Sequence, residues 1–101
     1  MAKTRLCSIE AVASGSILEC EAGKGRKVCV ARCGEEFFAF QAACPHQELP
    51  LCDGVMEGHV LTCLGHLWQW NARTGEPEGL AEQPLQTYRV VRKGDLLYLE
   101  E

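Results

Sequence analysis

Two short fragments of the chain combine cysteine with histidine. The first is Cys44-x-His46 and the second is Cys63-x-x-His66, with residues 47–62 between them. Thiolate sulfur and neutral imidazole nitrogen are both strong metal ligands, and each fragment would supply one of each kind. Only three histidines occur in the 101 residues, so two of them beside cysteines indicate a shared site rather than scattered surface residues.

The donor set alone leaves two metal groups open. A single zinc ion would accept two sulfurs and two nitrogens in a tetrahedral site. A two-iron, two-sulfide cluster would accept them as well, with the cysteines on one iron and the histidines on the other. Zinc sites more often place two cysteines in the same short loop, whereas each fragment here mixes the ligand types. The mixture favours a cluster in which each loop reaches both irons, with zinc as the alternative.

The segments around these fragments read as short strands joined by glycine-containing turns. Alternating or apolar runs predict strands over 4–7, 16–21, 26–32, 37–40, 58–62, 67–71, 87–92 and 96–100. Ser8 is expected to cap one helical turn over residues 9–12. No helical periodicity is longer than about two turns. The expected fold class is all-β, with a small antiparallel sandwich or barrel as its base.

Residues 43–86 depart from a plain barrel. Turn-forming residues dominate 44–54, and residues 76–84 form a loop with Pro77 and Pro84 near its ends. Long loops in a compact domain usually carry function. We therefore expect one domain over residues 1–101, with a cluster-binding subdomain at about 43–86 that consists of two ligand loops and the proline loop.

Composition argues against several other classes of protein. The formal charge is −4 and the ten lysines and arginines are scattered, which disfavours nucleic-acid binding. The odd count of seven cysteines and a start without a signal-peptide pattern disfavour a disulfide framework. The sequence has no apolar run long enough to suggest a membrane span. We expect a soluble, cytoplasmic monomer, in which the cysteines outside the two fragments are free thiols: Cys7, Cys20, Cys29, Cys33 and Cys52.

The spacing Cys-x-His, sixteen residues, Cys-x-x-His resembles the signature of Rieske proteins, and the resemblance extends over essentially the whole chain. Within that family, Cys-Pro-His-Gln-Glu-x-Pro-Leu and His-Leu-Trp-x-Trp-Asn are most similar to ferredoxins of multicomponent di-iron monooxygenases for toluene, related arenes and alkenes. The resemblance implies one [2Fe–2S] cluster. Cys44 and Cys63 would bind one ferric iron as thiolates, and His46 and His66 would bind the other through neutral imidazoles.

The chain departs from the Rieske proteins of respiratory complexes in both ligand loops. Leu49 and Gly65 stand where those proteins have disulfide cysteines, so no bridge should clamp the loops. Trp68 replaces a serine whose hydroxyl bonds a cluster sulfide, which predicts a potential towards the low end of roughly −150 to +300 mV. Gln47 and Trp68 lie beside ligands in the sequence and are candidates for supporting those ligands from outside the cluster or for contacting a docked partner. Trp70 alternates with Trp68, so one ring is expected to face the loop and the other the base.

The number of histidines distinguishes an electron-transfer protein from an oxygenase that catalyses a reaction itself. Rieske oxygenases add a mononuclear iron held by two histidines and a carboxylate, and only His59 remains here for such a site. His59 is expected on a surface strand. The sequence also lacks a glycine-rich phosphate loop for a nicotinamide or flavin. We therefore expect no catalytic residues, and not an enzyme but an electron-transfer component of a multicomponent oxygenase system.

The resemblance implies a ferredoxin that takes single electrons from an NADH-dependent flavoprotein reductase. It would pass them to an oxygenase or hydroxylase component, with a di-iron aromatic or alkene monooxygenase as the favoured system. Alternatives are the ferredoxin of a Rieske aromatic-ring dioxygenase and the small Rieske subunit of a nitrite reductase. A zinc-stabilised interaction module is the alternative from a different class.

Overall fold

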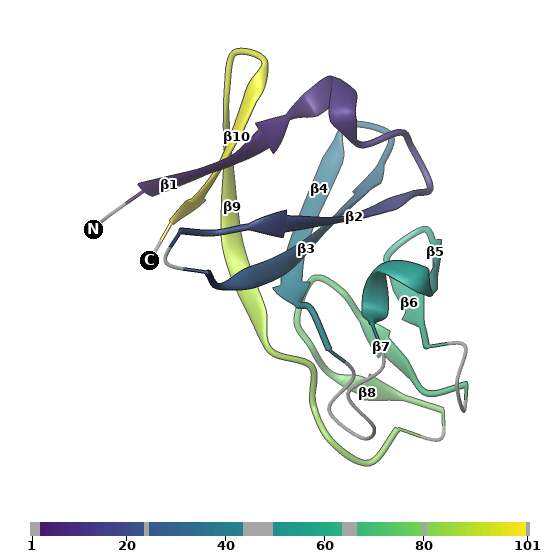
Figure 1. Ribbon diagram of the computed structural model, residues 1–101. Coiled ribbons are helices and arrows are strands. Elements are labelled where there is room, and N and C mark those ends of the chain that lie inside the picture. Colours follow the sequence, from purple (N-terminus) through teal and green to yellow (C-terminus); the bar gives the residue numbers. More distant parts are fainter. Residues whose placement is uncertain (1–2, 24, 44–49, 64–66, 80, 101) are drawn as a thin grey trace.

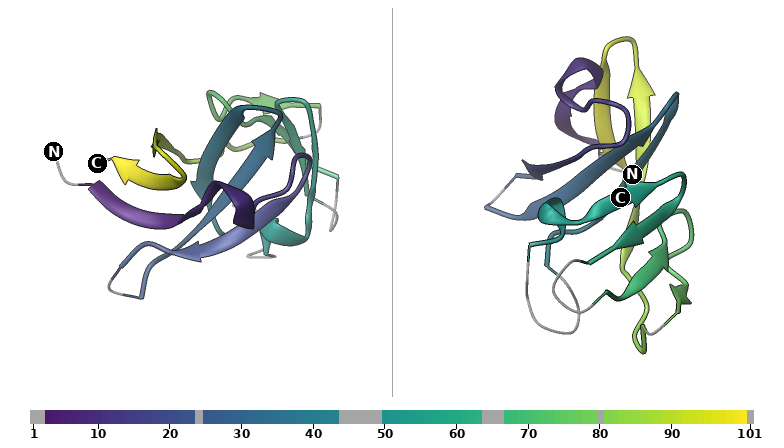
Figure 2. Two further views of the ribbon diagram at one scale, coloured as in Figure 1. Left: turned by 90° about the horizontal axis from the view of Figure 1, so that it is seen from above. Right: turned by 90° about the vertical axis from the view of Figure 1, so that its right-hand side faces the viewer.

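A curled antiparallel sheet of six strands forms the base of the molecule (Figure 1; two further views in Figure 2). The structure is a computed structural model that describes residues 3–23, 25–43, 50–63, 67–79 and 81–100. The strand order is β1-β10-β9-β4-β3-β2, so the first two strands of the chain are the two edges of the sheet. The bounds are β1 Lys3–Ser8, β2 Ile17–Glu21, β3 Lys27–Cys33, β4 Glu36–Gln41, β9 Thr87–Lys93 and β10 Leu96–Glu100.

A second sheet of four short strands lies within the expected cluster-binding subdomain, at the lower right of Figure 1. Its order is β5-β6-β7-β8, and every neighbouring pair is antiparallel. The bounds are β5 Val55–Glu57, β6 Val60–Thr62, β7 Gln69–Asn71 and β8 Pro77–Glu78. A 3₁₀ turn, Leu51–Asp53, leads directly into β5. The all-β fold class is confirmed.

Most strands begin and end within two residues of where the sequence pattern predicts them. The strand expected over 58–62 is shorter, because Gly58, with a φ of 61°, and His59 form the turn of the β5–β6 hairpin. The strand assignment for His59 was therefore wrong, and β5 was missed. The helical turn after Ser8 is a 3₁₀ turn, Ile9–Ala11, and the Ser8 side chain makes no capping hydrogen bond. Among the described residues, no helix has the length and hydropathy to cross a bilayer.

The buried side chains form two clusters on opposite sides of the base sheet. One cluster lies between the base and the small sheet and includes Phe40 and Trp70. The other lies inside the curl of the base and includes Val28 and Leu97. All four are 0% exposed. Successive side chains of a strand point to opposite faces, so β3 contributes to both clusters and needs a continuous apolar run.

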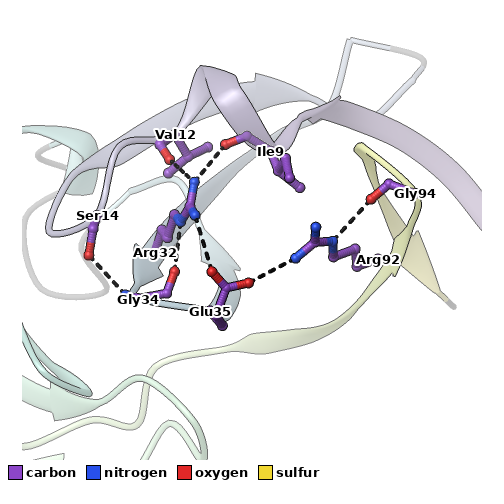
Figure 3. A network of polar contacts seen from close by, with 8 residues as sticks. All are labelled: Ile9, Val12, Ser14, Arg32, Gly34, Glu35, Arg92 and Gly94. Atoms are coloured by element: carbon purple, nitrogen blue, oxygen red, sulfur yellow. Dashed lines mark hydrogen bonds and ion pairs between the residues drawn. The ribbon is translucent and has the colours of Figure 1, made fainter.

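An arginine network closes the end of the base that is remote from β7 and β8 (Figure 3). Arg32 Nη1 donates to the carbonyl oxygens of Ile9, at 3.2 Å, and of Val12, at 3.3 Å. Glu35 lies between two guanidinium groups, 3.8 Å from Arg32 Nη2 and 3.0 Å from Arg92 Nη1. These contacts fix the segment after β1 to the β3–β4 turn. The network therefore has a structural role in the base.

Candidate metal centre

The second Cys/His fragment lies in the sequence between β6 and β7, and Cys63 is its described residue. The last ladder pair before it is Thr62 with Gln69, and the Gln69 Nε2 atom donates to Thr62 Oγ1 at 3.1 Å. The backbone then closes once more, because Cys63 N–H donates to the Trp68 carbonyl at 2.8 Å and Leu67 N–H donates to the Cys63 carbonyl at 2.9 Å. Cys63 is 2% exposed. Its sulfur is therefore held at the base of a short, backbone-closed loop.

Leu67 carries two unfavourable features at the end of this loop. Its φ is 60°, and it is the non-glycine residue with positive φ in the described chain. An L-residue in the left-handed region crowds its Cβ against the following carbonyl. The side chain is also 61% exposed, one of two large exposed apolar side chains among the described residues. Glycine would avoid both costs, so the position of Leu67 is notable.

The first fragment begins and ends at a similar closure. Ala43 and Pro50 form an isolated antiparallel bridge, and Leu51 N–H donates to the Ala42 carbonyl at 2.8 Å. Leu51 itself is 0% exposed and belongs to the cluster between the two sheets. The ends of the 44–49 segment are therefore fixed next to each other. Three expected ligands, Cys44, His46 and His66, lie outside the described residues, as does Gln47.

The two closures lie next to one another because the chain passes from one to the other through a tight contact at Gly54. A Cβ on Gly54 would stand 2.5 Å from the Thr62 carbonyl oxygen and 3.1 Å from that of Leu51. Only glycine allows the 3₁₀ turn after the first fragment to approach the last residue of β6 so closely. Cys63 follows Thr62 directly. The fold thus brings the exit of the first fragment to the entry of the second.

The proline-containing segment is fastened beside these loops. Trp70, 0% exposed, donates from Nε1 to the Gln83 carbonyl at 2.8 Å, and Leu85 N–H donates to the Gly75 carbonyl at 2.9 Å. The rings of Trp68 and Trp70 meet edge to face, with centroids 6.1 Å apart and planes at 70°. Both rings belong to the same core cluster. The expectation that they face opposite sides was wrong, because residues two apart in an extended segment point to the same face.

The other described cysteines form no disulfide with one another. Cys52 lies in the 3₁₀ turn, 4.0 Å from carboxylate oxygens of Glu19 and Asp53, and burial together with these charges raises the pKa of its thiol. Burial raises the pKa of Cys29 to about 12. Among the described residues, no group of three or more histidine, cysteine and acidic side chains could hold a metal ion.

The surroundings of Cys63 fit those of a thiolate ligand to a [2Fe–2S] cluster. A cluster thiolate needs a site shielded from water and a fixed backbone, and Cys63 has both. The two short segments that would supply the remaining donors each begin and end at a backbone closure beside the same core. That arrangement suits ligands that must converge from two loops.

Comparison with known proteins identifies the family. A family model described as the Rieske [2Fe–2S] domain matches residues 2–89. The chain is 43% identical to the ferredoxin subunit of methanesulfonate monooxygenase from Methylosulfonomonas methylovora, covering 89% of this chain and 73% of that one. It is 38% identical to the ferredoxin component of biphenyl 2,3-dioxygenase from Rhodococcus jostii, covering 94% and 89%.

The fold agrees with a solved ferredoxin structure. The chain matches the complex of reduced oxygenase and oxidised ferredoxin in carbazole 1,9a-dioxygenase, with a TM-score of 0.87, 26% identity, and coverage of 96% of this chain and 91% of that chain. Both of these relatives are named as ferredoxin components of oxygenase systems. The expected electron carrier with one [2Fe–2S] cluster is confirmed, and the chain belongs to the Rieske [2Fe–2S] domain family.

Proposed function

We propose that Cys44 and Cys63 bind one iron of the cluster as thiolates and that His46 and His66 bind the other through imidazole nitrogen. The observation that carries this proposal is the position of Cys63, which is 2% exposed at the base of a loop closed by two backbone hydrogen bonds. The first fragment begins after a comparable closure. When bound, the cluster accepts and releases one electron at a time.

The protein's own residues would exclude water from the thiolate side of the site. Trp68 is 7% exposed, and Leu51 and Trp70 are 0% exposed in the same cluster of side chains as Cys63. For Trp68 this burial supports packing beneath the second loop more strongly than a docking contact. Trp68 also stands where a serine hydroxyl would bond a sulfide in high-potential Rieske proteins, so we expect a potential towards the low end of roughly −150 to +300 mV.

The distribution of charge supports a basic protein partner at the cluster end. Residues 43–86 contain six acids and one base, a net charge of −5, whereas the remaining residues contain eight acids and nine bases, a net charge of +1. The one base, Arg73, is bound to Glu36 of the base sheet. The acids are Glu48, Asp53, Glu57, Glu76, Glu78 and Glu82. Such a surface steers association with a cationic face and makes the rate sensitive to salt.

The proposed role is electron transfer from an NADH-dependent flavoprotein reductase to an oxygenase component, in the cytoplasm. The names of the relatives support the oxygenase partner, and a ferredoxin bound to its oxygenase is among the matched structures. We favour a monooxygenase, and within that class a di-iron aromatic or alkene system, on the motif His-Leu-Trp-x-Trp-Asn. A ring dioxygenase is the second candidate, supported by the 38% identity to the biphenyl system's ferredoxin.

The test is electron paramagnetic resonance of the anaerobically purified protein after reduction with dithionite, combined with an iron and zinc assay. We expect a rhombic Rieske signal, two irons per chain and no zinc. Cys63→Ser should lose the signal and the iron, whereas Cys33→Ser, a matched change on a half-buried cysteine of β3, should retain both. A colourless protein with one zinc per chain would overturn the cluster assignment and favour the interaction module.

A further inference from the structure

Two thiols meet where the two edges of the base sheet approach each other. Cys7 on β1 and Cys20 on β2 pack in the same core cluster and their thiols influence each other's pKa, although these strands are at opposite ends of the hydrogen-bonded order. The sheet therefore curls far enough for its first and last strands to become neighbours. No ladder hydrogen bonds connect β1 to β2 in the described sheet, so side chains hold this seam.

A second contact gives the register of the seam. A Cβ on Gly23, just after β2, would lie 3.8 Å from Thr4 Cγ2 on β1. The step from Thr4 to Cys7 advances three residues, and the step from Gly23 to Cys20 retreats three. The two contacts thus share one antiparallel alignment, in which Cys7 and Cys20 stand opposite each other. Opposed side chains of neighbouring strands can meet across a seam, and a disulfide requires Cα atoms roughly 4.4–6.8 Å apart.

The surroundings leave one of the two sulfurs accessible. Cys20 is 7% exposed and belongs to the core cluster inside the curl, whereas Cys7 is half-buried at the edge of that cluster. A β-bulge between Arg5 and Cys7 interrupts the pairing of β1 with β10 at this point. Bulges re-aim side chains in an edge strand. A small oxidant can therefore reach the Cys7 sulfur from solvent and leave Cys20 as the second, shielded thiol.

We propose that Cys7 and Cys20 are a disulfide-forming pair that covalently closes the base sheet into a barrel when a low-molecular-weight disulfide is present. The Cys7 thiolate attacks one sulfur of the reagent and releases one thiol. The Cys20 sulfur then attacks Cys7 and releases the second. Two protein thiols lose two electrons and two protons, and the reagent disulfide gains both to become two thiols.

The pKa values of the two thiols differ in a way that favours Cys7 as the first nucleophile. Burial raises the pKa of Cys20 to about 12. Burial also raises the pKa of Cys7, but the hydrogen bond from Cys20 lowers it in part. Because the thiolate is the nucleophile, the reaction is slow near neutral pH and accelerates as the pH rises. The two thiols therefore form a disulfide only under sustained oxidising conditions.

The Cys7–Cys20 disulfide would stabilise the base sheet and leave the proposed cluster site unchanged. The bond would join residues 7 and 20, which restricts the unfolded chain and removes the open seam between two edge strands. Cys7 and Cys20 belong to the core cluster inside the curl, whereas Cys63 belongs to the cluster between the two sheets. The optical spectrum of the holoprotein should therefore be unchanged by the bond.

The experiment incubates the holoprotein with oxidised glutathione at alkaline pH, followed by alkylation, peptide mapping by mass spectrometry and thermal unfolding. We expect a Cys7–Cys20 peptide pair lighter by two hydrogens, with an increase in melting temperature of roughly 10 °C that dithiothreitol reverses. Cys7→Ser should abolish the pair and the increase, and Cys33→Ser should leave both intact.

Two results would overturn the proposal. One is that Cys7 and Cys20 are alkylated as thiols after an incubation in which the half-exposed Cys52 forms a mixed disulfide with glutathione. The other is a disulfide that maps to a different pair, such as Cys29 with Cys52. Since wild-type protein with and without oxidant gives the central comparison, a folding defect in a variant does not decide the outcome. Loss of the cluster does not decide it either, because mapping is independent of iron.

Discussion

Arg73, in the turn that follows β7, forms a bidentate ion pair with Glu36 of β4. Its Nε atom lies 2.6 Å from Glu36 Oε2 and its Nη2 atom lies 2.7 Å from Oε1. This two-pronged contact joins the end of the small sheet to the base sheet, across 37 residues of sequence. Both side chains remain about half exposed, at 53% and 42%. Solvent therefore screens the pair, and its main effect is to orient the two sheets.

The pair predicts a pH dependence. The Arg73 hydrogen bond lowers the pKa of Glu36 from its ordinary value of 4.5. A carboxyl whose pKa is depressed in the folded state contributes stability above its unfolded pKa and loses it as the pH falls through the folded pKa. Glu36→Gln should lower the melting temperature at pH 7 by at most about 5 °C. The difference from wild type should vanish at acid pH. Equal differences at both pH values would contradict this, and Glu57→Gln on an exposed strand end is the control.

Gly75 permits the close approach that fastens the proline-containing segment. Its φ is 82°, and a Cβ there would collide with the Leu85 carbonyl oxygen. Gly75→Ala should destabilise the protein by about 2–4 kcal/mol, because backbone strain and a backbone clash add. Gly15→Ala is the matched control, since Gly15 has a φ of 84° and nothing within 4 Å of an added Cβ. Urea unfolding measures both, and equal losses would show that the clash contributes nothing.

Replacing Leu67 by glycine should remove its side chain without lowering the stability of the protein. Its φ of 60° and its 61% exposure make it strained and nearly uncompensated by burial. Leu67→Gly should leave the free energy of unfolding unchanged or raise it by up to about 1 kcal/mol, since relief of strain exceeds the added entropy of the unfolded chain. Leu67→Ala keeps the strain and should show no gain. A loss above about 1 kcal/mol for Leu67→Gly would mean that its side chain packs in the folded protein.

Trp70 predicts an effect of one hydrogen bond on the proline-containing segment. Trp70→Phe keeps a ring in the core but removes the donor to the Gln83 carbonyl, 2.8 Å away. We expect a loss of about 1–3 kcal/mol and faster hydrogen exchange at Leu85, whose N–H bonds Gly75 nearby. Phe40→Leu, another fully buried change in the same cluster, should cost stability without selectively speeding exchange there. Uniform acceleration in both variants would count against a specific role of the indole.

The fold class and the family were accessible from sequence because both depend on local patterns. Alternating apolar residues and glycine turns specify short strands, and the ligand spacing from Cys44 to His66 is a property of the chain alone. The β5 strand was missed because it has three residues and becomes a strand only through pairing with β6. His59 was misplaced for the same reason, since the turn it occupies exists only once that hairpin forms.

Sequence alone determined which residue types could hold a metal group, how far apart they stand, and how unevenly charge divides between the subdomain and the base. Tertiary structure decided which residues far apart in the sequence meet, such as Glu36 with Arg73 and Cys7 with Cys20. These pairs depend on strand register and sheet curl. Such properties arise from the packing of the whole core, because no local propensity records which edge of a sheet will face another.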